Sequence, residues 1–231
     1  MRFRAHFLTN RQTQATTSAM SRPTRRLVHR VAAFAALATF LSIGSVSGGA
    51  AFAGTSMFTV WSPDLASGTF DKKFTLNAFG CTGSNLSPAI QWANLPAGTK
   101  SLALQVQDKG ATTDAGFWHW TVYNIPATAS GLPQGAGNAP GTLPAPAFGG
   151  ANDFLDTGAT GGNGNYGGPC PPVGDKPHRY VFTLYALSVA DVQAASGIPK
   201  TGTAALHSFI LNKGLGDKVL GKVSFIASSQ R

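Results

Sequence analysis

The sequence predicts an all-β domain with one minor helix, and three observations lead to this prediction. Residues 101–108, "SLALQVQD", and residues 118–125, "WHWTVYNI", alternate between two faces as half-buried strands do. Residues 179–187, "RYVFTLYAL", are apolar on both faces, which indicates a central strand covered on two sides. Long segments rich in glycine and proline separate these stretches, as expected for loops between strands.

Alternation along a strand also predicts which side chains share a face. In the second of these stretches, Trp118 and Trp120 would share one face, and His119 would lie on the other. His178, just before the third stretch, and Tyr180, within it, are two residues apart, so they would point to one face. Shorter strands are expected at 57–61, 73–76, 89–92 and 222–227.

A single helix is expected, from Thr203 to Lys213, where apolar residues recur at helical spacing and Gly214 suits the end. The longest loop runs from Pro126 to Tyr166, and a loop of that length is usually functional or covers another part of the domain. The sequence shows neither an internal repeat nor a second domain.

The first 53 residues are interpreted as an export signal that is cleaved after Ala53. They carry seven arginines and no acidic residue, followed by the apolar run 31–44 and an A-x-A site at 51–53. The apolar run falls short of the roughly 20 residues that a membrane span needs. We therefore expect one domain, residues 54–231, without a membrane span, in the periplasm or secreted.

The charge of the chain belongs mostly to this signal. The whole chain has a formal charge of +9, with 18 Lys and Arg against nine acidic residues, and removing the seven signal arginines leaves 11 − 9 = +2. A nucleic-acid-binding role loses its main support with that change.

The chain has two cysteines, Cys81 and Cys170. In an oxidising compartment a disulfide is favoured over a redox or metal pair, although two free buried thiols remain the alternative. A zinc site is disfavoured because the sequence lacks a C-x-x-C pair and its histidines are scattered.

Four residues could carry chemistry: Asp108, His119, His178 and Tyr180. Imidazolium and hydroxyl donors suit an anion, and a carboxylate would orient one histidine through its second nitrogen. The alternative is that these are structural residues, with Asp108 forming a turn, and His207 is assigned to the solvated or structural class.

One motif is set aside. Residues 162–167, "GNGNYG", match the glycine spacing of a dinucleotide site, but such a site needs a preceding strand and a following helix. Here the chain continues into "GPCPP" at 168–172, which cannot begin a long helix.

Several blocks of the chain resemble one known family. They are "GSNLSPAIQW", "AGTKSLALQVQD", "FWHWTVYNIP", "NDF" and "YGGPCPPVGDKPHRYVFTLYAL", in this order. They are similar to the phosphatidylethanolamine-binding proteins, in particular the bacterial Raf kinase inhibitor-like branch (YbhB/YbcL type). The resemblance extends over residues 58–226.

The resemblance implies a Greek-key antiparallel β-sandwich with a C-terminal-region helix and a pocket at one end that binds small anions, including phospholipid head groups. It assigns the pocket to Asp108, His119, Gly168, Pro169, Pro171, His178 and Tyr180, and it strengthens the Cys81–Cys170 disulfide. Neither a cofactor nor a metal is implied. The prolines would form a rigid wall that holds the histidine and tyrosine in place at little ordering cost.

One segment departs from the family pattern D-P-D-A-P. Asp108 is kept, but Lys109, Gly110 and Thr112 replace both prolines and the second acid. We expect Lys109 to bring a positive charge near the rim of the pocket, so head-group selectivity is not carried over.

Two functions follow from these residues. The preferred one is a non-enzymatic binding protein in which His119, His178 and Tyr180 donate to an anion and Asp108 orients His119; a protease or a host protein would be its protein partner. The alternative is a hydrolase of phosphoesters or esters that uses a metal or acid–base chemistry in the same pocket. Against the hydrolase, no serine or cysteine nucleophile is placed beside a base. A purely structural or partner-binding role is the third option.

Overall fold

The computed structural model of the chain describes residues 56–138 and 142–231. The export signal predicted for residues 1–53 lies outside the described residues, and so does the start of the predicted domain at 54. No helix in the described ranges combines the length and apolar character that crossing a membrane would need.

The described residues form eight strands in two antiparallel sheets, as the predicted β-sandwich requires. The smaller sheet has the order β1-β2-β5, with β1 at Thr59–Trp61, β2 at Ile90–Ala93 and β5 at Gly131–Leu132. The larger sheet has the order β6-β4-β3-β7-β8, with bounds Phe148–Gly149, Phe117–Pro126, Ser101–Asp108, His178–Leu187 and Val219–Ser229. Strand β7 returns after a long connection to pair with β3, which is the crossover of a Greek key.

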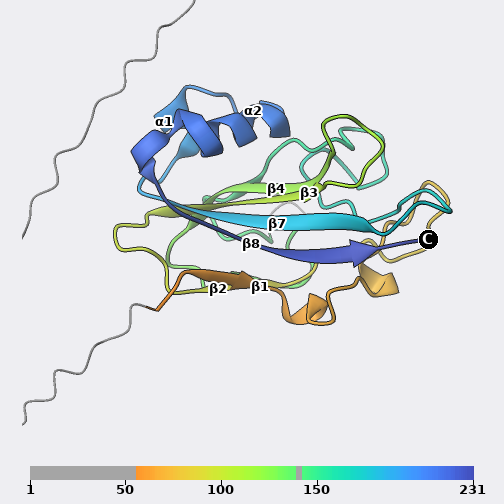
Figure 1. Cartoon of the computed structure of the whole chain (residues 1–231). Helices are drawn as coiled ribbons and strands as arrows, with labels where there is room; N and C mark the ends of the chain where they lie inside the picture. The colour runs from red at the N-terminus through yellow and green to blue at the C-terminus, as the bar shows by residue number, and fades with distance from the viewer. Residues whose placement is uncertain (1–55, 139–141) are drawn as a thin grey trace, which may run out of the picture. The chain divides into compact units, whose positions relative to one another are not determined.

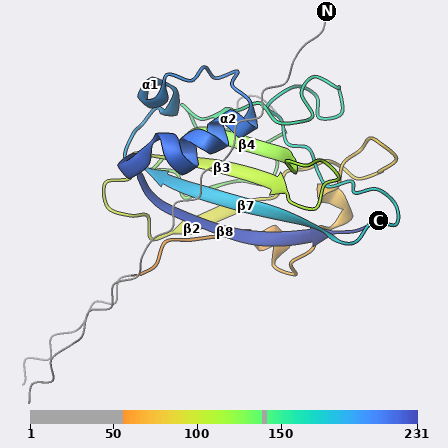
Figure 2. The ribbon, with the colours of Figure 1, turned by 45° about the horizontal axis from the view of Figure 1, so that its top comes forward.

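The larger sheet is the middle layer of the domain. Figure 1 shows helices α1, Val192–Ser196, and α2, Ala204–Phe209, on one side of it and the smaller sheet on the other. Figure 2, turned by 45°, shows the two helices lying over β3 and β4. One apolar core fills the space between the two sheets, and a second lies between the larger sheet and the helices.

This arrangement explains the burial of the central strands. In β7, Phe182 and Leu184 pack between the sheets while Tyr185 and Leu187 pack under the helices, so the predicted covering on two sides is confirmed. Strand β3 differs from its prediction as a half-buried strand, because all of its residues are buried. The helices cover the face that carries Gln105, which alternation alone would leave to solvent.

The helical region also differs in part from the prediction. Helix α2 begins after the cap Thr203 but ends at Phe209, and a π-helical turn, Ile210–Gly214, continues it. Helix α1 was not predicted; Asp191 caps its start by accepting from the Ala194 N–H. His207 is fully buried and stacks on Tyr123 with ring centroids 4.3 Å apart, which places it in the structural class.

The strand predicted at 73–76 is wrong. Residues Lys72–Phe74 form a 3-10 turn instead. Further 3-10 turns occur at Pro63–Leu65 and, near the C-terminus, at Gly216–Lys218. The N–H of Leu76 donates to the carbonyl oxygen of Pro169 rather than to a neighbouring strand. This segment therefore supports the proline-rich loop and does not extend a sheet.

A β-bulge in β4 reverses the predicted faces of its first residues. Trp120 is opposite Val106 and Trp118 is opposite the very next residue of β3, Gln107, so His119 is an extra residue on its strand. Trp120 accordingly packs between the sheets, whereas Trp118 lies beside Gln107 on the helix side. The prediction that both tryptophans share a face is wrong, and the bulge redirects His119.

Candidate functional site

A cavity of about 430 Å³ opens at one end of the larger sheet. Antiparallel pairing creates it, because the last residue of β3, Asp108, is opposite Tyr180 of β7 and Phe117 of β4. The end of one strand thus meets the beginnings of two others. The cavity is lined by Asp108, His119, His178 and Tyr180, which are the four residues singled out from the sequence.

His119 holds a defined tautomer in this cavity. Its Nδ1 lies 2.8 Å from the Gly167 carbonyl oxygen, and because a carbonyl only accepts, Nδ1 carries the hydrogen. Burial lowers the pKa of His119 to about 4, against the opposing effects of the Gly167 carbonyl and the Asp108 charge. At neutral pH the ring is uncharged, and its Nε2 is left as an acceptor.

His178 is held between two carboxylates. Its Nδ1 lies 2.7 Å from Oδ2 of Asp108, and its Nε2 lies 3.2 Å from Oδ2 of Asp175. The prediction that Asp108 orients His119 is therefore wrong, since the carboxylate binds the other imidazole. Both nitrogens of His178 are occupied by protein groups, so its predicted role as a direct donor to an anion requires Asp175 to move aside.

Asp108 connects several parts of the site. It is only 3% exposed, and its Oδ1 accepts the N–H of Gly110 at 2.7 Å. Burial, and next the nearby Asp108 carboxylate, raise the pKa of the Tyr180 hydroxyl well above its ordinary value. Tyr180 therefore keeps its proton, and its ring meets the His119 ring edge-on with centroids 5.0 Å apart.

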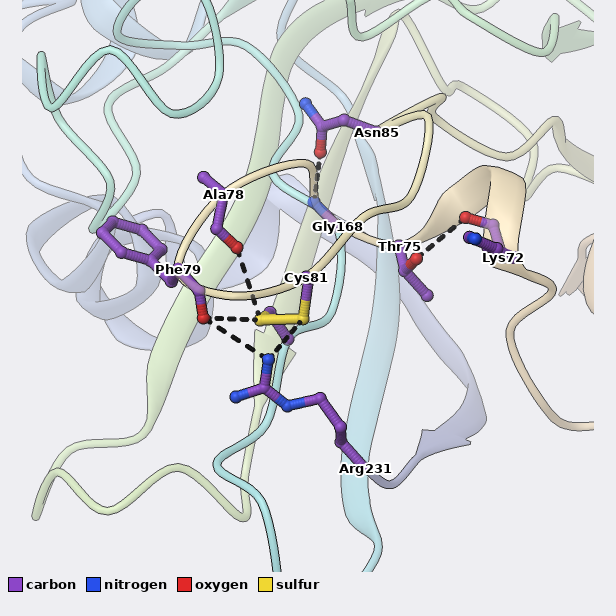
Figure 3. Close-up of a disulfide and its surroundings, with 9 residues drawn as sticks. Lys72, Thr75, Ala78, Phe79, Cys81, Asn85, Gly168 and Arg231 are labelled. Atoms are coloured by element: carbon purple, nitrogen blue, oxygen red, sulfur yellow. Dashed lines mark hydrogen bonds between the residues drawn. A yellow bond between two sulfur atoms is a disulfide. The ribbon is translucent and has the colours of Figure 1, made fainter.

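The proline-rich loop closes one side of the cavity, where Gly168, Cys170, Pro171 and Pro172 line it. The N–H of Gly168 donates to Oδ1 of Asn85 at 2.7 Å, as Figure 3 shows. A Cβ at position 168 would lie 2.2 Å from the Phe74 carbonyl oxygen, so the close approach requires glycine.

Pro169 is the exception among the predicted site residues. It is not among the residues that line this cavity; it lines a neighbouring hollow, and its carbonyl accepts the N–H of Leu76. Its predicted place in the ligand-binding set stays a prediction, and the contact that the structure shows for it is the support it gives to the segment around Leu76.

Cys81 and Cys170 form a disulfide across a sequence separation of 89 residues, as expected. Figure 3 shows the bridge beside Phe79 and the C-terminal Arg231, whose Nη1 lies 3.2 Å from the Cys81 sulfur. Cys170 and Phe79 both line the cavity. The bridge therefore ties the proline-rich loop to the segment around Phe79, which follows the 3-10 turn Lys72–Phe74.

Sequence reasoning missed several residues of the cavity. Phe117 and Phe154 stand at its side with ring centroids 4.9 Å apart, and each also meets the His119 ring edge-on. Asp153 is the second acid of the lining; burial raises its pKa although it accepts the N–H of Trp118. The block "NDF", residues 152–154, belonged to the quoted resemblance and was the signal that could have found two of them.

The departures from the family segment have different effects. Thr112 lines the cavity, and Gly110 packs so closely that a Cβ there would lie 3.1 Å from atoms of His178. Lys109 does not approach the rim as predicted. Its N–H extends the ladder by donating to the Arg179 carbonyl, and its side chain lines a hollow on the helix side of the sheet.

The chemical character of the cavity follows from these contacts. Two carboxylates line it, and among the described residues of its lining there is neither a lysine nor an arginine. In residues 56–138 and 142–231, no group of three or more His, Cys, Asp or Glu side chains is arranged to hold a metal ion. The cavity therefore offers acceptors, hydroxyl donors and aromatic walls.

Comparison with known proteins agrees with this architecture. A family model described as phosphatidylethanolamine-binding protein matches residues 66–225. UPF0098 protein YbcL of Escherichia coli (strain K12) is 42% identical over 157 residues, covering 67% of this chain and 80% of YbcL. UPF0098 protein YbhB of the same strain is 38% identical over 125 residues, covering 54% of this chain and 74% of YbhB.

A solved structure is also similar. The crystal structure of E. coli YbcL, described as a new member of the mammalian PEBP family, superimposes with a TM-score of 0.65 at 36% identity. The superposition covers 76% of this chain and 99% of that structure.

Proposed function

The chain belongs to the phosphatidylethanolamine-binding protein family, and on that premise we propose that the cavity around His119 binds a small phosphate-bearing ligand without transforming it. The family binds anionic ligands. The finer proposal is that the preferred ligand here is a phosphomonoester that carries one proton.

One observation carries this choice of ligand, the hydrogen bond between Nδ1 of His119 and the Gly167 carbonyl oxygen. It leaves Nε2 as an acceptor, so the ligand has to bring a hydrogen, and the P–OH group of a phosphomonoester monoanion supplies one. A fully ionised phosphate would have no such hydrogen and would add two charges beside Asp108 and Asp153.

The remaining groups suit the same ligand. The hydroxyl of Thr112 at the lining donates to a phosphate oxygen, while the hydroxyl of Tyr180, which bonds the Asp108 carboxylate, holds that acid in place. Phe117 and Phe154 offer an apolar wall to the organic part of the ester. The disulfide and the prolines hold one side in place, which lowers the ordering cost of binding.

A binding role without catalysis is supported by the state of the potential nucleophiles. The sulfur of Cys170 is in the disulfide, and no serine is among the described residues of the lining. Among the described residues, the hydrogen bonds of the two imidazoles go to a carbonyl for His119 and to carboxylates for His178, and none joins either ring to a hydroxyl or thiol.

The disulfide supports a location outside the cytoplasm, because such bonds persist in oxidising compartments. We infer a periplasmic or secreted protein on this ground. A protein partner, whether a protease or a host protein, stays a prediction.

Calorimetry tests the proposal with phosphoethanolamine as the ligand and glycerophosphoethanolamine, a diester without a P–OH group, as its comparator. We expect the monoester to bind more tightly at pH 5.5 than at pH 8, because the second pKa of a phosphomonoester is about 6. We expect the diester to bind weakly at both values. His119→Ala should lose the preference, and equal affinity of both proteins for the monoester would remove this cavity from the account.

A further inference from the structure

The hollow lined by Lys109, which we call the outer hollow, lies on the helix side of the larger sheet. It measures about 220 Å³, and its walls come from β3, β4, β7, β8 and the helical segment after Thr203. Its floor is made of buried side chains, among them Gln105 at 4% exposure, Gln107 at 8% and Trp118. Buried polar side chains on a strand face are unusual, and each needs a partner.

The charge of the outer hollow is opposite to that of the His119 cavity. Its charged residues are Lys109 and Lys222, and no carboxylate is among the described residues that line it. Lys222 is fixed in place, because its Nζ lies 2.7 Å from Oδ1 of Asn212 and 5.4 Å from the centroid of the Tyr185 ring. Two cations without a counter-charge favour an anionic ligand at this face.

The uncharged groups point to a ligand that also carries hydroxyls. Gln105 and Gln107 donate their amide nitrogens to the hydroxyl of Tyr123 and the carbonyl of Ala115, so their amide oxygens remain as acceptors. Thr183, Ser208 and Ser224 add further hydroxyls around the hollow. The ring of Trp118 adds an apolar, π-rich surface, which suits the C–H face of a sugar.

The π-helical turn completes the wall. In it the N–H of Leu215 reaches back to the carbonyl of Ile210, and single π turns occur frequently at functional sites. The turn holds Asn212 against the sheet, where its Nδ2 donates to the hydroxyl of Tyr185 at 3.1 Å.

We propose that the outer hollow is a second binding site, separate from the His119 cavity, that takes a small hydroxylated carboxylate such as a hexuronic acid. Lys109 and Lys222 bind the carboxylate, the glutamine oxygens and the Ser and Thr hydroxyls bind the ring hydroxyls, and Trp118 contacts the ring face. This site is independent of the ligand of the first cavity.

Titration of the purified protein with glucuronate, glucose and sulfate, followed by NMR of the Trp118 indole and the Gln105 and Gln107 side-chain amides, tests the proposal. We expect glucuronate to shift these signals, whereas glucose, which lacks the charge, and sulfate, which lacks the ring hydroxyls, bind more weakly. No shift with glucuronate at millimolar concentration, or equal binding of sulfate, would overturn the assignment.

Matched variants separate this site from the first one. Lys222→Met and Lys109→Met should each weaken glucuronate binding by about tenfold, the effect of removing one charge-assisted bond. Lys222→Arg should keep most of the binding, and Lys72→Met, at an exposed lysine of a 3-10 turn, should keep all of it. His119→Ala should leave glucuronate binding intact, whereas glucuronate binding that is lost in His119→Ala and kept in Lys222→Met would move the ligand to the first cavity.

Discussion

Asp108 and His178 lie at the ends of neighbouring antiparallel strands, with Oδ2 of the acid 2.7 Å from Nδ1 of the imidazole. Both side chains are almost fully buried, at 4% exposure for Asp108 and 6% for His178. This pair fixes the orientation of His178 and brings the end of β3 against the start of β7. The free imidazole of the cavity is therefore His119, whose tautomer is set by a backbone carbonyl.

Asp108→Asn is expected to lower the free energy of unfolding by about 2 kcal/mol, because the amide has only one acceptor oxygen and cannot accept from both Gly110 and the buried His178. Urea unfolding at pH 7 measures the change. Asp114→Asn, at an exposed acid in the adjoining loop, is the matched control and should change stability by less than about 0.5 kcal/mol. Similar losses in both variants would show that the pair with His178 contributes nothing specific.

Acidification from pH 6.5 to pH 4 is expected to destabilise the fold through His119. Burial lowers its pKa to about 4 in the folded protein, against 6.5 for the ordinary ring. Between these values the unfolded chain binds the proton more strongly, so stability falls as the pH falls, by on the order of 3 kcal/mol in total.

Urea unfolding across this pH range, with His119→Gln as the control, isolates the effect. Asp108 and His178 act on the His119 ring and are retained in the variant. The variant should show a smaller loss of stability on acidification than the native protein. If the free energy of unfolding fell equally with pH in the two proteins, the prediction that His119 is buried as an uncharged ring would be contradicted.

Gly168→Ala is expected to destabilise the protein by about 3 kcal/mol, since the new Cβ would meet the Phe74 carbonyl oxygen at 2.2 Å and that backbone has to move. Gly174→Ala, in the same loop, is the control. Gly174 has a φ of +90° but nothing within 4 Å of its Cβ position, so about 1 kcal/mol is expected there. Thermal unfolding of both variants measures the difference, and a harmless Gly168→Ala would refute the close approach.

Replacing both cysteines, Cys81→Ser with Cys170→Ser, is expected to cost about 4 kcal/mol, the value of the chain-entropy model for a loop of this size. Urea unfolding measures it. The native protein under a reducing agent should lose the same amount. A double variant as stable as the oxidised protein would show that the bridge does not constrain the unfolded chain.

Much of the site was predictable because strand ends are recognisable in the sequence. Periodicity located the strands that became β3, β4 and β7, and antiparallel pairing then brings Asp108 beside Tyr180. Gln105, Gln107 and Lys109 are each two residues apart and share one face of β3. Lys109 comes one residue after the end of this strand, so the same alternation places it on the helix side. The family's D-P-D-A-P segment had predicted that Lys109 lies near the rim of the His119 cavity. The alternation of side chains along the strand contradicts that prediction.

The rest depends on tertiary structure that a strict period of two does not contain. The bulge at His119 adds one residue to β4, and every side chain before it changes face, so the pattern placed Trp118 wrongly. Asp153 and Asp175 approach the cavity from loops whose paths are set by contacts distant in sequence. Because neither the bulge nor these loop paths can be read from the sequence, Asp108 was predicted to orient His119, whereas it bonds His178.

The most direct test of the phosphate-binding account is nitrogen NMR of the histidine side chains while phosphoethanolamine is added at pH 6. In the free protein, His119 should show a hydrogen on Nδ1 and a bare Nε2, and the ligand should shift Nε2 selectively as it donates to that atom. Binding that leaves the Nε2 signal of His119 unchanged, or a free ring that carries its hydrogen on Nε2, would contradict the account.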